Sequence, residues 1–430
     1  MRPYHSPPRH PLFVDISGLL NQYPTNTCIN SASRNMFHTL RFSNFYSFLD
    51  EVEINFLMDN RSTKNEKSCD SSIVDCRVSK VIAVIGPNGA GKTNIIKPFS
   101  FLSWFISGSF FIERDQDLYA KPHFLSPDSP SEFEAEFEIE KRLFKYHLKI
   151  LNNEVIEEHL FEKTSRLWSR IFERRIDGDS YLIKQRGFGL DGRLAKKVKK
   201  NASLISTAAE HNISIAVLIS NYFRKTTSNI SWMGRSNFQG VRDLMTASSY
   251  FSENEHHKEA MSRLIRSWDF GIDDIAIEKV NSSNEAGKPD EKLMPFGVHC
   301  HEKKTFKMPF MAESSGTQAA YHLLSKLLPV LENGGFVAYD ELESDLHPLM
   351  LESIMQLFFS DLTNPHNAQI IFTTHSVHIL NELQKSQILL VEKNDSVSEA
   401  WRLSDMQGVR SDDNFYAKYM SGTYGAIPIL

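Results

Sequence analysis

A glycine-rich loop constrains the fold of this chain more than any other feature of its sequence. Residues 86–93 read Gly-Pro-Asn-Gly-Ala-Gly-Lys-Thr, a full match to the pattern G-x-x-x-x-G-K-[ST]. Directly before them, Lys80–Ile85 is a run rich in β-branched residues, typical of a strand buried on both faces. A helical stretch follows the loop. A strand, a glycine loop and a helix in this order form a phosphate-binding loop, so the sequence predicts an α/β protein that binds a nucleotide.

The residue types in the loop determine how the phosphates are expected to be held. Glycines let backbone N–H groups close around the β-phosphate, and the start of the following helix adds a favourable dipole. Lys92 is expected to reach the β- and γ-phosphates, and Thr93 to ligate Mg²⁺. Pro98 is expected to kink or shorten the helix. The predicted nucleotide-binding residues of the loop are Gly86, Pro87, Asn88, Gly89, Ala90, Gly91, Lys92 and Thr93.

A pair of carboxylates forms the second chemical signal. The apolar stretch Gly335–Tyr339 reads as a strand and ends in Asp340 and Glu341. Asp340 suits an outer-sphere contact to Mg²⁺, and Glu341 suits the base that orients the attacking water. A strand ending in two acids is a weak signal alone. Together with the phosphate loop it predicts ATP hydrolysis.

Two further segments carry chemistry. Ser314-Ser315-Gly316-Thr317-Gln318 opens an amphipathic helix, and serine and glycine at a helix start expose free N–H groups that suit a phosphate. In isolation such a segment is more often a helix cap. The stretch from Ile370 to Thr374 is a strand pattern that ends in a single histidine, His375. A structural histidine at a strand end is the ordinary explanation for such a residue.

The order of these four segments resembles the ABC-type ATPase superfamily, in its SMC/RecF/OLD-like branch. Residues 340–348 resemble the D-E-x-x-x-x-L-H-P block of that branch, and residues 44–48, Asn-Phe-Tyr-Ser-Phe, resemble its N-F-x-S-F opening strand. The segment 419–428 is similar to the ending of RloA/AbiLi-type ATPases, which are phage-defence proteins linked to restriction systems.

The resemblance implies a composite site. ATP held by Lys92 and Thr93 of one copy would be capped by Ser315 and Gly316 of a second copy, so the chain is expected to work as a homo-oligomer. It also implies that His375 senses the γ-phosphate. The expected catalytic residues are thus Lys92, Glu341 and His375, the expected metal ligands are Thr93 and Asp340, and the cofactors are ATP and Mg²⁺. The glutamine that many relatives carry after the loop helix has no obvious counterpart, and Ser314 and Thr317 replace the residues common in transporters.

The expected fold is α/β, a P-loop NTPase of ABC-ATPase type, with a split head, an antiparallel β meander lobe and a largely helical insertion. Alternating patterns at Glu132–Glu140, Leu143–Leu151 and Val155–Glu162 predict the meander, and helical patterns lie near 191–200, 213–223 and 255–268. The expected divisions are a poorly ordered extension (1–35), the N-terminal half of the head (36–163), a mainly helical basic insertion (164–292) and the C-terminal half of the head (293–430). The strand pattern that follows Met36 makes either Met1 or Met36 an acceptable start.

Charge is distributed unevenly along the chain. The whole sequence has 48 Lys and Arg against 53 Asp and Glu, a net charge of −5. The segment Lys163–Lys200 has 12 basic and 4 acidic residues, and Lys196–Lys200 is its densest part. Two interpretations stay open: a solvated helix face, or a surface that binds DNA, RNA or an acidic partner.

These observations predict an ABC-type Mg²⁺-ATPase that controls a separate nuclease effector in defence against phage. Only 55 residues follow His375, so a nuclease is expected to be a different protein rather than a further domain. The alternative is a RecF-like DNA-binding repair ATPase. An autonomous nuclease and a transporter subunit agree less well with the sequence. Sparse cysteines (Cys28, Cys69, Cys76 and Cys300) and the lack of an apolar run of about 20 residues predict a cytoplasmic protein without a membrane span.

Overall fold

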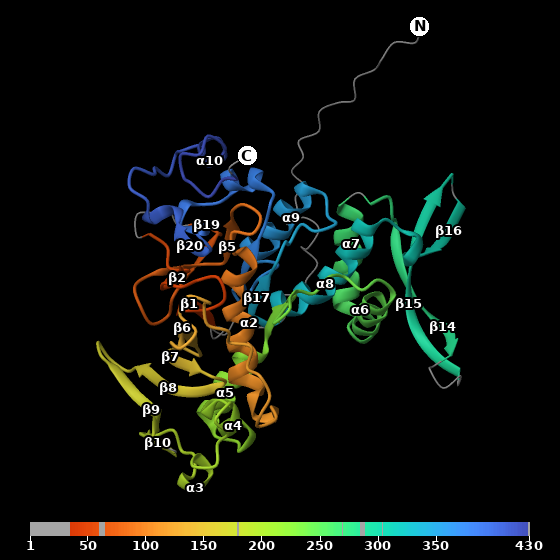
Figure 1. The fold of residues 1–430 in the computed structure, drawn as a ribbon. Coiled ribbons are helices and arrows are strands. Elements are labelled where there is room, and N and C mark those ends of the chain that lie inside the picture. The colour runs from red at the N-terminus through yellow and green to blue at the C-terminus, as the bar shows by residue number, and fades with distance from the viewer. Residues whose placement is uncertain are drawn as a thin grey trace.

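The computed structural model of the chain describes residues 35–59, 65–178, 180–268, 270–283, 289–302 and 304–428. The extension expected at residues 1–35 lies outside these ranges except for its last residue. Three parts can be followed in Figure 1: a central parallel sheet, an antiparallel lobe below it, and a group of helices with a second antiparallel sheet at its side.

The central sheet has six strands, of which five are parallel and the edge strand β20 is antiparallel. Its order is β11 (Thr226–Ser228), β17 (Phe336–Tyr339), β18 (Gln369–Thr373), β5 (Val81–Ile85), β19 (Ile388–Asn394) and β20 (Val397–Arg402). Strand β5 is buried along its whole length, as its sequence predicts. Because β17, β18 and β5 are parallel, the residues that follow them gather at one edge of the sheet, where open α/β sheets hold their ligands.

The antiparallel lobe is a seven-stranded meander. Its order is β10 (Ser180–Gln185), β9 (Trp168–Asp177), β8 (Glu154–Lys163), β7 (Arg142–Leu151), β6 (Ser131–Ile139), β1 (Met36–Ser43) and β2 (Val52–Asn55). Apolar residues alternate with charged ones along these strands, so one face packs on the core and the other faces solvent. The predicted meander is confirmed.

Helix α2 (Lys92–Gly108) follows the phosphate loop and lies between the central sheet and the lobe. Pro98 lies inside α2 and does not end it; the buried side chains of Ile95, Ile96 and Phe99 hold this part of the helix in the core. The remaining helices are α3 (Gly192–Ala195), α4 (Leu204–Glu210), α5 (Ser214–Arg224), α6 (Val241–Glu253), α7 (Glu255–Ser267), α8 (Ser315–Asn333), α9 (Pro348–Phe359) and α10 (Phe415–Met420). Short 3₁₀ turns are η1 (Ser109–Phe111), η2 (Phe310–Ala312), η3 (Val377–Glu382), η4 (Lys385–Gln387) and η5 (Leu403–Asp405).

Two apolar clusters cover the two faces of the central sheet. Ile82 and Val84 of β5 belong to a cluster with α2, α4, α5 and the inner face of the meander. The alternate residues Val81, Ala83 and Ile85 belong to a cluster with α6, α7, α8 and α9. The period of two along β5 therefore places one cluster on each face of the sheet.

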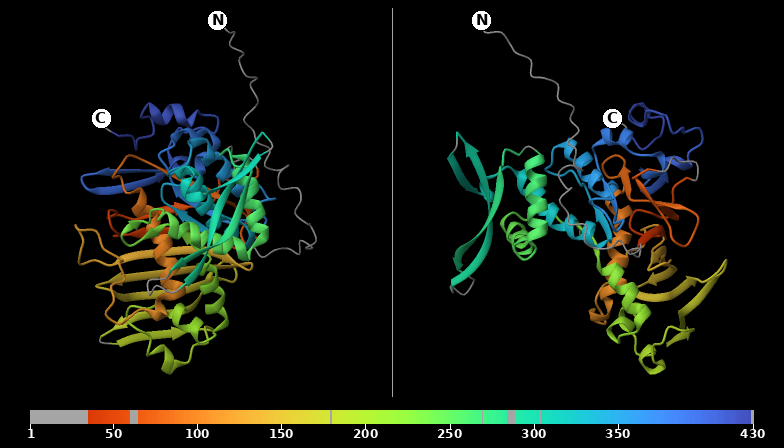
Figure 2. Two further views of the ribbon diagram at one scale, coloured as in Figure 1. Left: turned by 90° about the vertical axis from the view of Figure 1, so that its right-hand side faces the viewer. Right: turned by 180° about the vertical axis from the view of Figure 1, so that it is seen from behind.

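The remaining strands form small sheets. A three-stranded sheet of β14 (Asp274–Ser283), β15 (Pro289–His301) and β16 (Lys304–Pro309) stands beyond α6 and α7, on the side away from the central sheet (Figure 2). The pairs β3 (Ser68–Asp70) with β4 (Arg77–Ser79), and β12 (Ile230–Ser231) with β13 (Gly234–Arg235), are short hairpins. The register of β14 and β15 pairs residues 281–283 with residues 289–291 in an antiparallel manner.

The region predicted as a mainly helical insertion, 164–292, is more varied than its sequence indicates. Strands β9 and β10 continue the meander beyond the boundary that we placed at residue 163. Strand β11 joins the central sheet, and β14 and β15 form a sheet of their own. Arg174 explains part of the difference, because this charged residue occupies an inward position of β9 and so conceals the alternating pattern.

The α/β fold class is confirmed by this topology: a P-loop head assembled from two separated stretches of chain, with an antiparallel lobe. In the part of the chain that the structure describes, Cys69 is buried, Cys76 is half-buried and Cys300 is exposed. No described helix combines the length and the apolar character needed to cross a bilayer.

Candidate nucleotide-binding site

Two glycines of the loop, Gly86 and Gly91, are required by close packing against other segments. A β-carbon at Gly86 would collide with the backbone oxygen of Val391 on β19. Gly91 has φ of 112°, which favours glycine, and a β-carbon there would lie 2.6 Å from Ser398 Oγ and 3.0 Å from Ser47 Oγ. Ser47 belongs to the Asn-Phe-Tyr-Ser-Phe segment, so that segment supports the loop from behind.

Lys92 is the first residue of α2, and its side chain is buried within the loop. Its Nζ donates to Gly86 O at 2.9 Å and to Pro87 O at 3.0 Å. Burial lowers the pKa of the Lys92 ammonium, while the charges of Asp340 and Glu341 act in the opposite direction. The cation therefore points into the loop, where backbone N–H groups at the helix start also favour an anion.

Thr93 and Asp340 are in contact although they lie 247 positions apart in the sequence. Thr93 Oγ1 donates to Asp340 Oδ2 at 2.7 Å, and Thr373 Oγ1 donates to Asp340 Oδ1 at 2.6 Å. Asp340 follows β17 and Thr373 ends β18, so the parallel sheet itself aligns them. Carboxylate and hydroxyl oxygens are the protein ligands that Mg²⁺ prefers, so the donor set of Thr93 and Asp340 fits this ion.

The backbone of Asp340 is fixed by a residue that the sequence did not reveal. Asn229 lies between β11 and β12; its Oδ1 accepts from Asp340 N at 2.7 Å, and its Nδ2 donates to Asp340 O at 2.9 Å. One side chain thus satisfies both backbone groups of the acid. No local pattern around Asn229 marks this contact, because it joins residues 111 positions apart.

Glu341 is held less tightly than Asp340. Its φ is 50°, in the left-handed region, and its N–H donates to Thr373 Oγ1 at 2.7 Å. On the carboxylate, Oε2 forms an ion pair with Arg235 and accepts from Ser344 Oγ at 3.2 Å. Oε1 lies 3.8 Å from His375 Nε2. The His375 backbone N–H donates to Glu343 Oε1 at 2.6 Å, which ties the histidine loop to the acidic segment.

A cavity of about 220 Å³ collects most of the predicted site residues. Its lining residues are Asn88, Gly89, Gly91, Lys92, Thr93, Asn94, Asp340, Glu341, His375 and Lys393. Gly86 and Pro87 contribute the carbonyl oxygens that Lys92 contacts, and Ala90 is buried beneath the loop with its oxygen bonded to Ser398. None of the described residues that line this cavity is a glutamine, so the structure supplies no counterpart there for the glutamine missing from the sequence.

Ser315 and Gly316 do not line this cavity. They begin α8, where Ser314 Oγ accepts from Thr317 N at 3.2 Å, which is the cap that the sequence allows. A β-carbon at Gly316 would lie 2.8 Å from Asp345 O, so the helix start packs on the segment after Glu341. Within one chain, the predicted signature and the phosphate loop are therefore separate surfaces.

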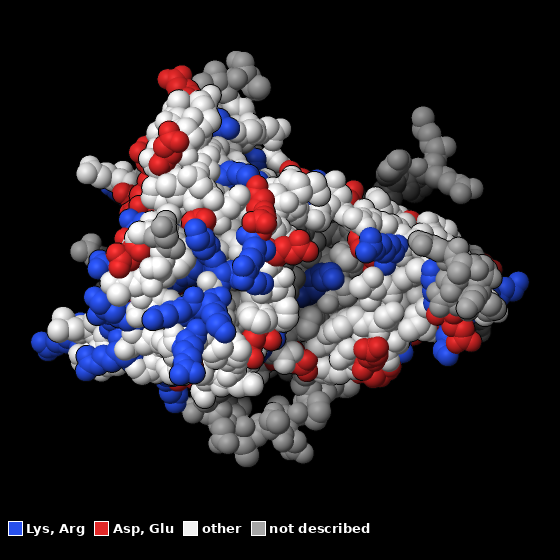
Figure 3. Space-filling view, turned by 60° about the horizontal axis from the view of Figure 1, so that its bottom comes forward, with Lys and Arg blue, Asp and Glu red and all other residues white. Residues whose placement is uncertain are grey.

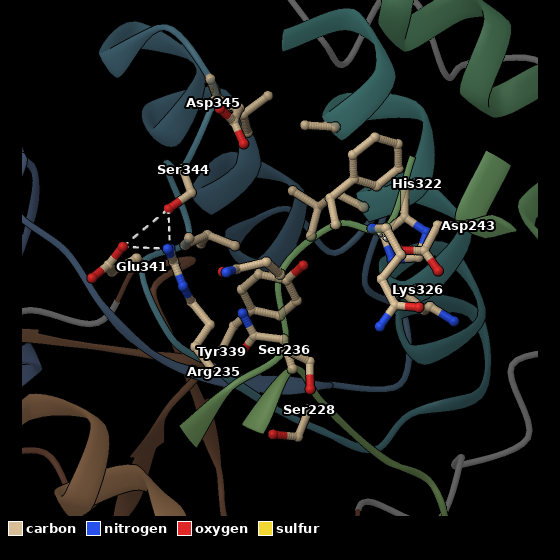
Figure 4. Close-up of a pocket in the computed structure, with 18 of the residues that line it drawn as sticks. Ser228, Arg235, Ser236, Asp243, His322, Lys326, Tyr339, Glu341, Ser344 and Asp345 are labelled. Carbon is tan, nitrogen blue, oxygen red and sulfur yellow. Dashed lines mark hydrogen bonds and ion pairs between the residues drawn. The ribbon is translucent and has the colours of Figure 1, made fainter. Parts of the chain in front are cut away.

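A second, larger cavity of about 550 Å³ adjoins the first, and Glu341 lines both. It lies between residues 227–243, helix α8 and residues 341–346. In Figure 4, Arg235, Ser344 and Glu341 meet on one side of this cavity, and His322, Asp243 and Lys326 lie on the other. Arg235 and Ser344 are further contacts that the sequence did not reveal.

The basic segment Lys163–Lys200 divides into buried and exposed cations. Arg174 is fully buried and donates to Ala202 O at 2.6 Å and to Lys199 O at 2.8 Å, and its Nη1 lies 3.3 Å from Glu158 Oε2. Lys199 Nζ donates to Phe110 O and Ile112 O. These cations hold the lobe together and are not a docking surface.

Apart from Arg166 in the turn after β8, five exposed cations of the same segment have no ion pair or side-chain hydrogen bond among the described residues. They are Lys184, Arg186, Arg193, Lys196 and Lys197. They lie on β10, on α3 and in the turns beside them, and we call them the lobe-tip cations. Figure 3 shows Lys and Arg side chains gathered over the lobe. The densest part, 196–200, is not the helix face that we considered, because α3 ends at Ala195 and Val198 is buried.

Comparison with known proteins identifies the sequence family. Residues 81–381 match the family described as "AAA domain, putative AbiEii toxin, Type IV TA system". A search of curated proteins finds no match.

Among solved structures, the Smc head domain of Pyrococcus furiosus with the C-terminal domain of ScpA aligns at 14% identity and a TM-score of 0.40, over 86% of this chain and 97% of that one. The Smc head domain of Pyrococcus yayanosii aligns at 11% identity and a TM-score of 0.40, over 86% of this chain and 97% of that one. RecF with ATP gives 11% identity and a TM-score of 0.34, over 87% of this chain and 100% of that one.

Proposed function

The chain belongs to the AAA-domain family that includes the putative AbiEii toxin, and from this premise we propose that it binds and hydrolyses Mg²⁺-ATP. The observation that carries the proposal is the cavity in which Lys92, Thr93, Asp340, Glu341 and His375 meet at the edge of the parallel sheet. Each has the chemistry that its place requires: a cation within the phosphate loop, two oxygen ligands, a carboxylate and an imidazole.

Each side chain then has a distinct role. Lys92 and the loop N–H groups bind the β- and γ-phosphates, and Thr93 and Asp340 would hold Mg²⁺, which neutralises charge on the phosphate oxygens when it is bound. Glu341 orients the attacking water and takes its proton, and His375 contacts the γ-phosphate. Asn229 and Thr373 keep Asp340 in place for this purpose.

We further propose that two copies form the complete site. Ser315 and Gly316 begin α8 and stay outside the cavity of their own chain, so their free N–H groups are available to a nucleotide held by another copy. A twofold arrangement of two identical heads would produce two such sites. ATP then favours the engaged dimer, and hydrolysis favours its separation.

The dimer can be tested with the variant Glu341→Gln, which should bind ATP without hydrolysing it. We expect its mass in sedimentation to double when Mg²⁺-ATP is added and to stay unchanged with ADP. The matched control, Glu341→Gln with Lys92→Ala, should stay monomeric under both conditions. A Glu341→Gln chain that binds ATP and remains monomeric would contradict the composite site.

For the biological role, we propose that the chain is an RloA/AbiLi-type regulator of a separate nuclease in phage defence, working in the cytoplasm. The family description names a putative toxin of a Type IV TA system, which supports a role in a system of paired proteins. The test is to purify Glu341→Gln from the cells that encode it and to assay the bound fraction for nuclease activity. Nuclease activity that is absent from the chain alone and present in the complex is the expected result; its absence from both would contradict the role.

A second candidate, a RecF-like DNA-binding ATPase, is supported by the lobe-tip cations. Five exposed positive charges on one end of the lobe are an arrangement that binds phosphates in a salt-dependent manner. ATP-stimulated, salt-sensitive DNA binding by the purified chain alone would favour this candidate over the nuclease regulator.

A further inference from the structure

Arg235 contacts the carboxylate that we assign to water activation, and it does so from outside the nucleotide cavity. It ends the hairpin of β12 and β13, and it lines the 550 Å³ cavity and not the 220 Å³ cavity of the phosphate loop. Glu341 lines both and so stands on the wall between them. Arg235 therefore holds Glu341 from the side opposite the phosphates.

The contact occupies one of the two carboxylate oxygens of Glu341. Glu341 Oε2 is paired with Arg235 and also accepts from Ser344 Oγ at 3.2 Å, and Arg235 bonds to Ser344 as well (Figure 4). Oε1 lies 3.8 Å from His375 Nε2. A carboxylate that orients water must present an oxygen within hydrogen-bond distance of that water. The mutual contact of Arg235, Ser344 and Glu341 opposes the use of Oε2 for this purpose.

The arrangement is easily released. The side chains of Arg235 and Glu341 are 28% and 35% exposed, and exposed ion pairs are weak. The cavity on the far side of Arg235 offers the guanidinium space to leave without repacking the core. Arg235 is also carried by a two-residue strand, and the hairpin turn before it contains the exposed side chain of Met233 beside Trp232, whose ring stacks on Tyr119.

We propose that Arg235 is a positioning residue that withholds the Glu341 carboxylate from the attacking water until the β12–β13 hairpin moves. The proposal rests on the function proposed above, in which Glu341 activates that water. Asn229 anchors the start of the hairpin beside Asp340, and Arg235 at its end contacts Glu341. A shift of the hairpin would therefore change the position of the Glu341 carboxylate while Asn229 keeps Asp340 fixed.

The test measures ATP turnover by the purified full chain. Arg235→Ala should raise kcat about 5-fold, or ~1 kcal/mol at ~1.4 kcal/mol per factor of ten, with KM unchanged. Arg235→Lys, which keeps a cation, should return kcat towards the wild-type value. Arg242→Ala is the matched control: it removes an exposed arginine from the same cavity that makes no contact with Glu341, and its kcat should equal the wild type.

A double variant, Arg235→Ala with Glu341→Gln, shows whether Arg235 acts through the carboxylate, since the gain should then disappear. An Arg235→Ala chain that binds ATP normally but has an equal or lower kcat would overturn the proposal. If Lys92→Ala instead bound ATP as tightly as the wild type does, the proposed function itself would be overturned. Thermal unfolding of each variant separates a change in kcat from a loss of folded protein.

Discussion

The phosphate loop and the acidic strand end form two sides of one cavity, but they are held in different ways. The loop is fixed by its own backbone and by close packing: Lys92 bonds to carbonyl oxygens of its own loop, and Gly86 and Gly91 pack directly against β19 and Ser398. The acids are fixed by distant segments, Asp340 by Asn229 and Thr373, and Glu341 by Arg235.

The two acids also differ from each other. Asp340 is 3% exposed and each of its carboxylate oxygens accepts from a threonine, whereas Glu341 is half-buried and shares one oxygen with residues of another cavity. The difference teaches that the residues assigned to phosphate and Mg²⁺ binding are tightly held, while the residue assigned to chemistry is held by a short hairpin that we propose can move. The variants below test this contrast.

The largest effect is expected for Lys92→Ala. Removing the cation from a preformed phosphate site should lower ATP turnover by about 10²–10³-fold, the range seen when one charge-stabilising donor is lost. The measurement is steady-state phosphate release together with ATP binding by calorimetry. Lys80→Met is the matched control, because Lys80 is also buried but pairs with Asp361 away from the cavity. Turnover retained by Lys92→Ala would contradict the assignment of the phosphate loop to the ATP site.

Asp340→Asn should have the next largest effect. The amide keeps the shape of the side chain but loses the charge that suits Mg²⁺, so turnover should fall about 10–100-fold and require more Mg²⁺. A titration of turnover against Mg²⁺ measures both changes, and EDTA should abolish turnover in the wild type. An unchanged Mg²⁺ dependence in Asp340→Asn would place the ion elsewhere.

Asn229→Ala tests the two hydrogen bonds that fix the backbone of Asp340. Two hydrogen bonds to the Asp340 backbone disappear, so the free energy of unfolding should fall by about 1–3 kcal/mol and turnover should fall several-fold. Urea unfolding and turnover on the same sample measure these effects. If Asn229→Ala raised kcat as Arg235→Ala is expected to, the two residues would not have the different roles that we assign: Asn229 fixing Asp340, and Arg235 withholding the Glu341 carboxylate.

The smallest effect on turnover is expected at the lobe tip. Reversing Lys184, Arg186, Lys196 and Lys197 to Glu should leave turnover without DNA unchanged, because these side chains lie outside the nucleotide cavity. If the lobe tip binds nucleic acid, the same change should weaken binding at least 10-fold and reduce its salt dependence. Reversal of two exposed cations elsewhere, Lys304 and Arg410, is the control. Equal DNA binding by all three chains would exclude the lobe tip as a binding surface.

The features that the sequence predicted are those determined by neighbouring residues. The phosphate loop is one contiguous motif between a buried strand and a helix, and the acids follow an apolar strand, so the local pattern was enough to predict that each follows a strand. The meander strands β6, β7 and β8 have clear alternation and were also predicted.

The features that the sequence did not predict depend on long-range contacts. Asn229 and Arg235 lie in a segment without a motif and meet residues more than 100 positions away. Strand β9 was concealed because Arg174, a buried cation that bonds to Lys199 O and Ala202 O, occupies an inward position. Such positions are set by the packed fold and leave no local period in the sequence.

The most direct test of the composite ATP site is complementation between two variants. Lys92→Ala lacks the loop cation, and Ser315→Arg places a bulky side chain on the exposed start of α8. Each variant alone should have almost no turnover. In an equal mixture, half of the dimers contain both chains and each of these retains one intact site, so about a quarter of the wild-type turnover should return. No recovery in the mixture, or full turnover by Ser315→Arg alone, would contradict the composite site.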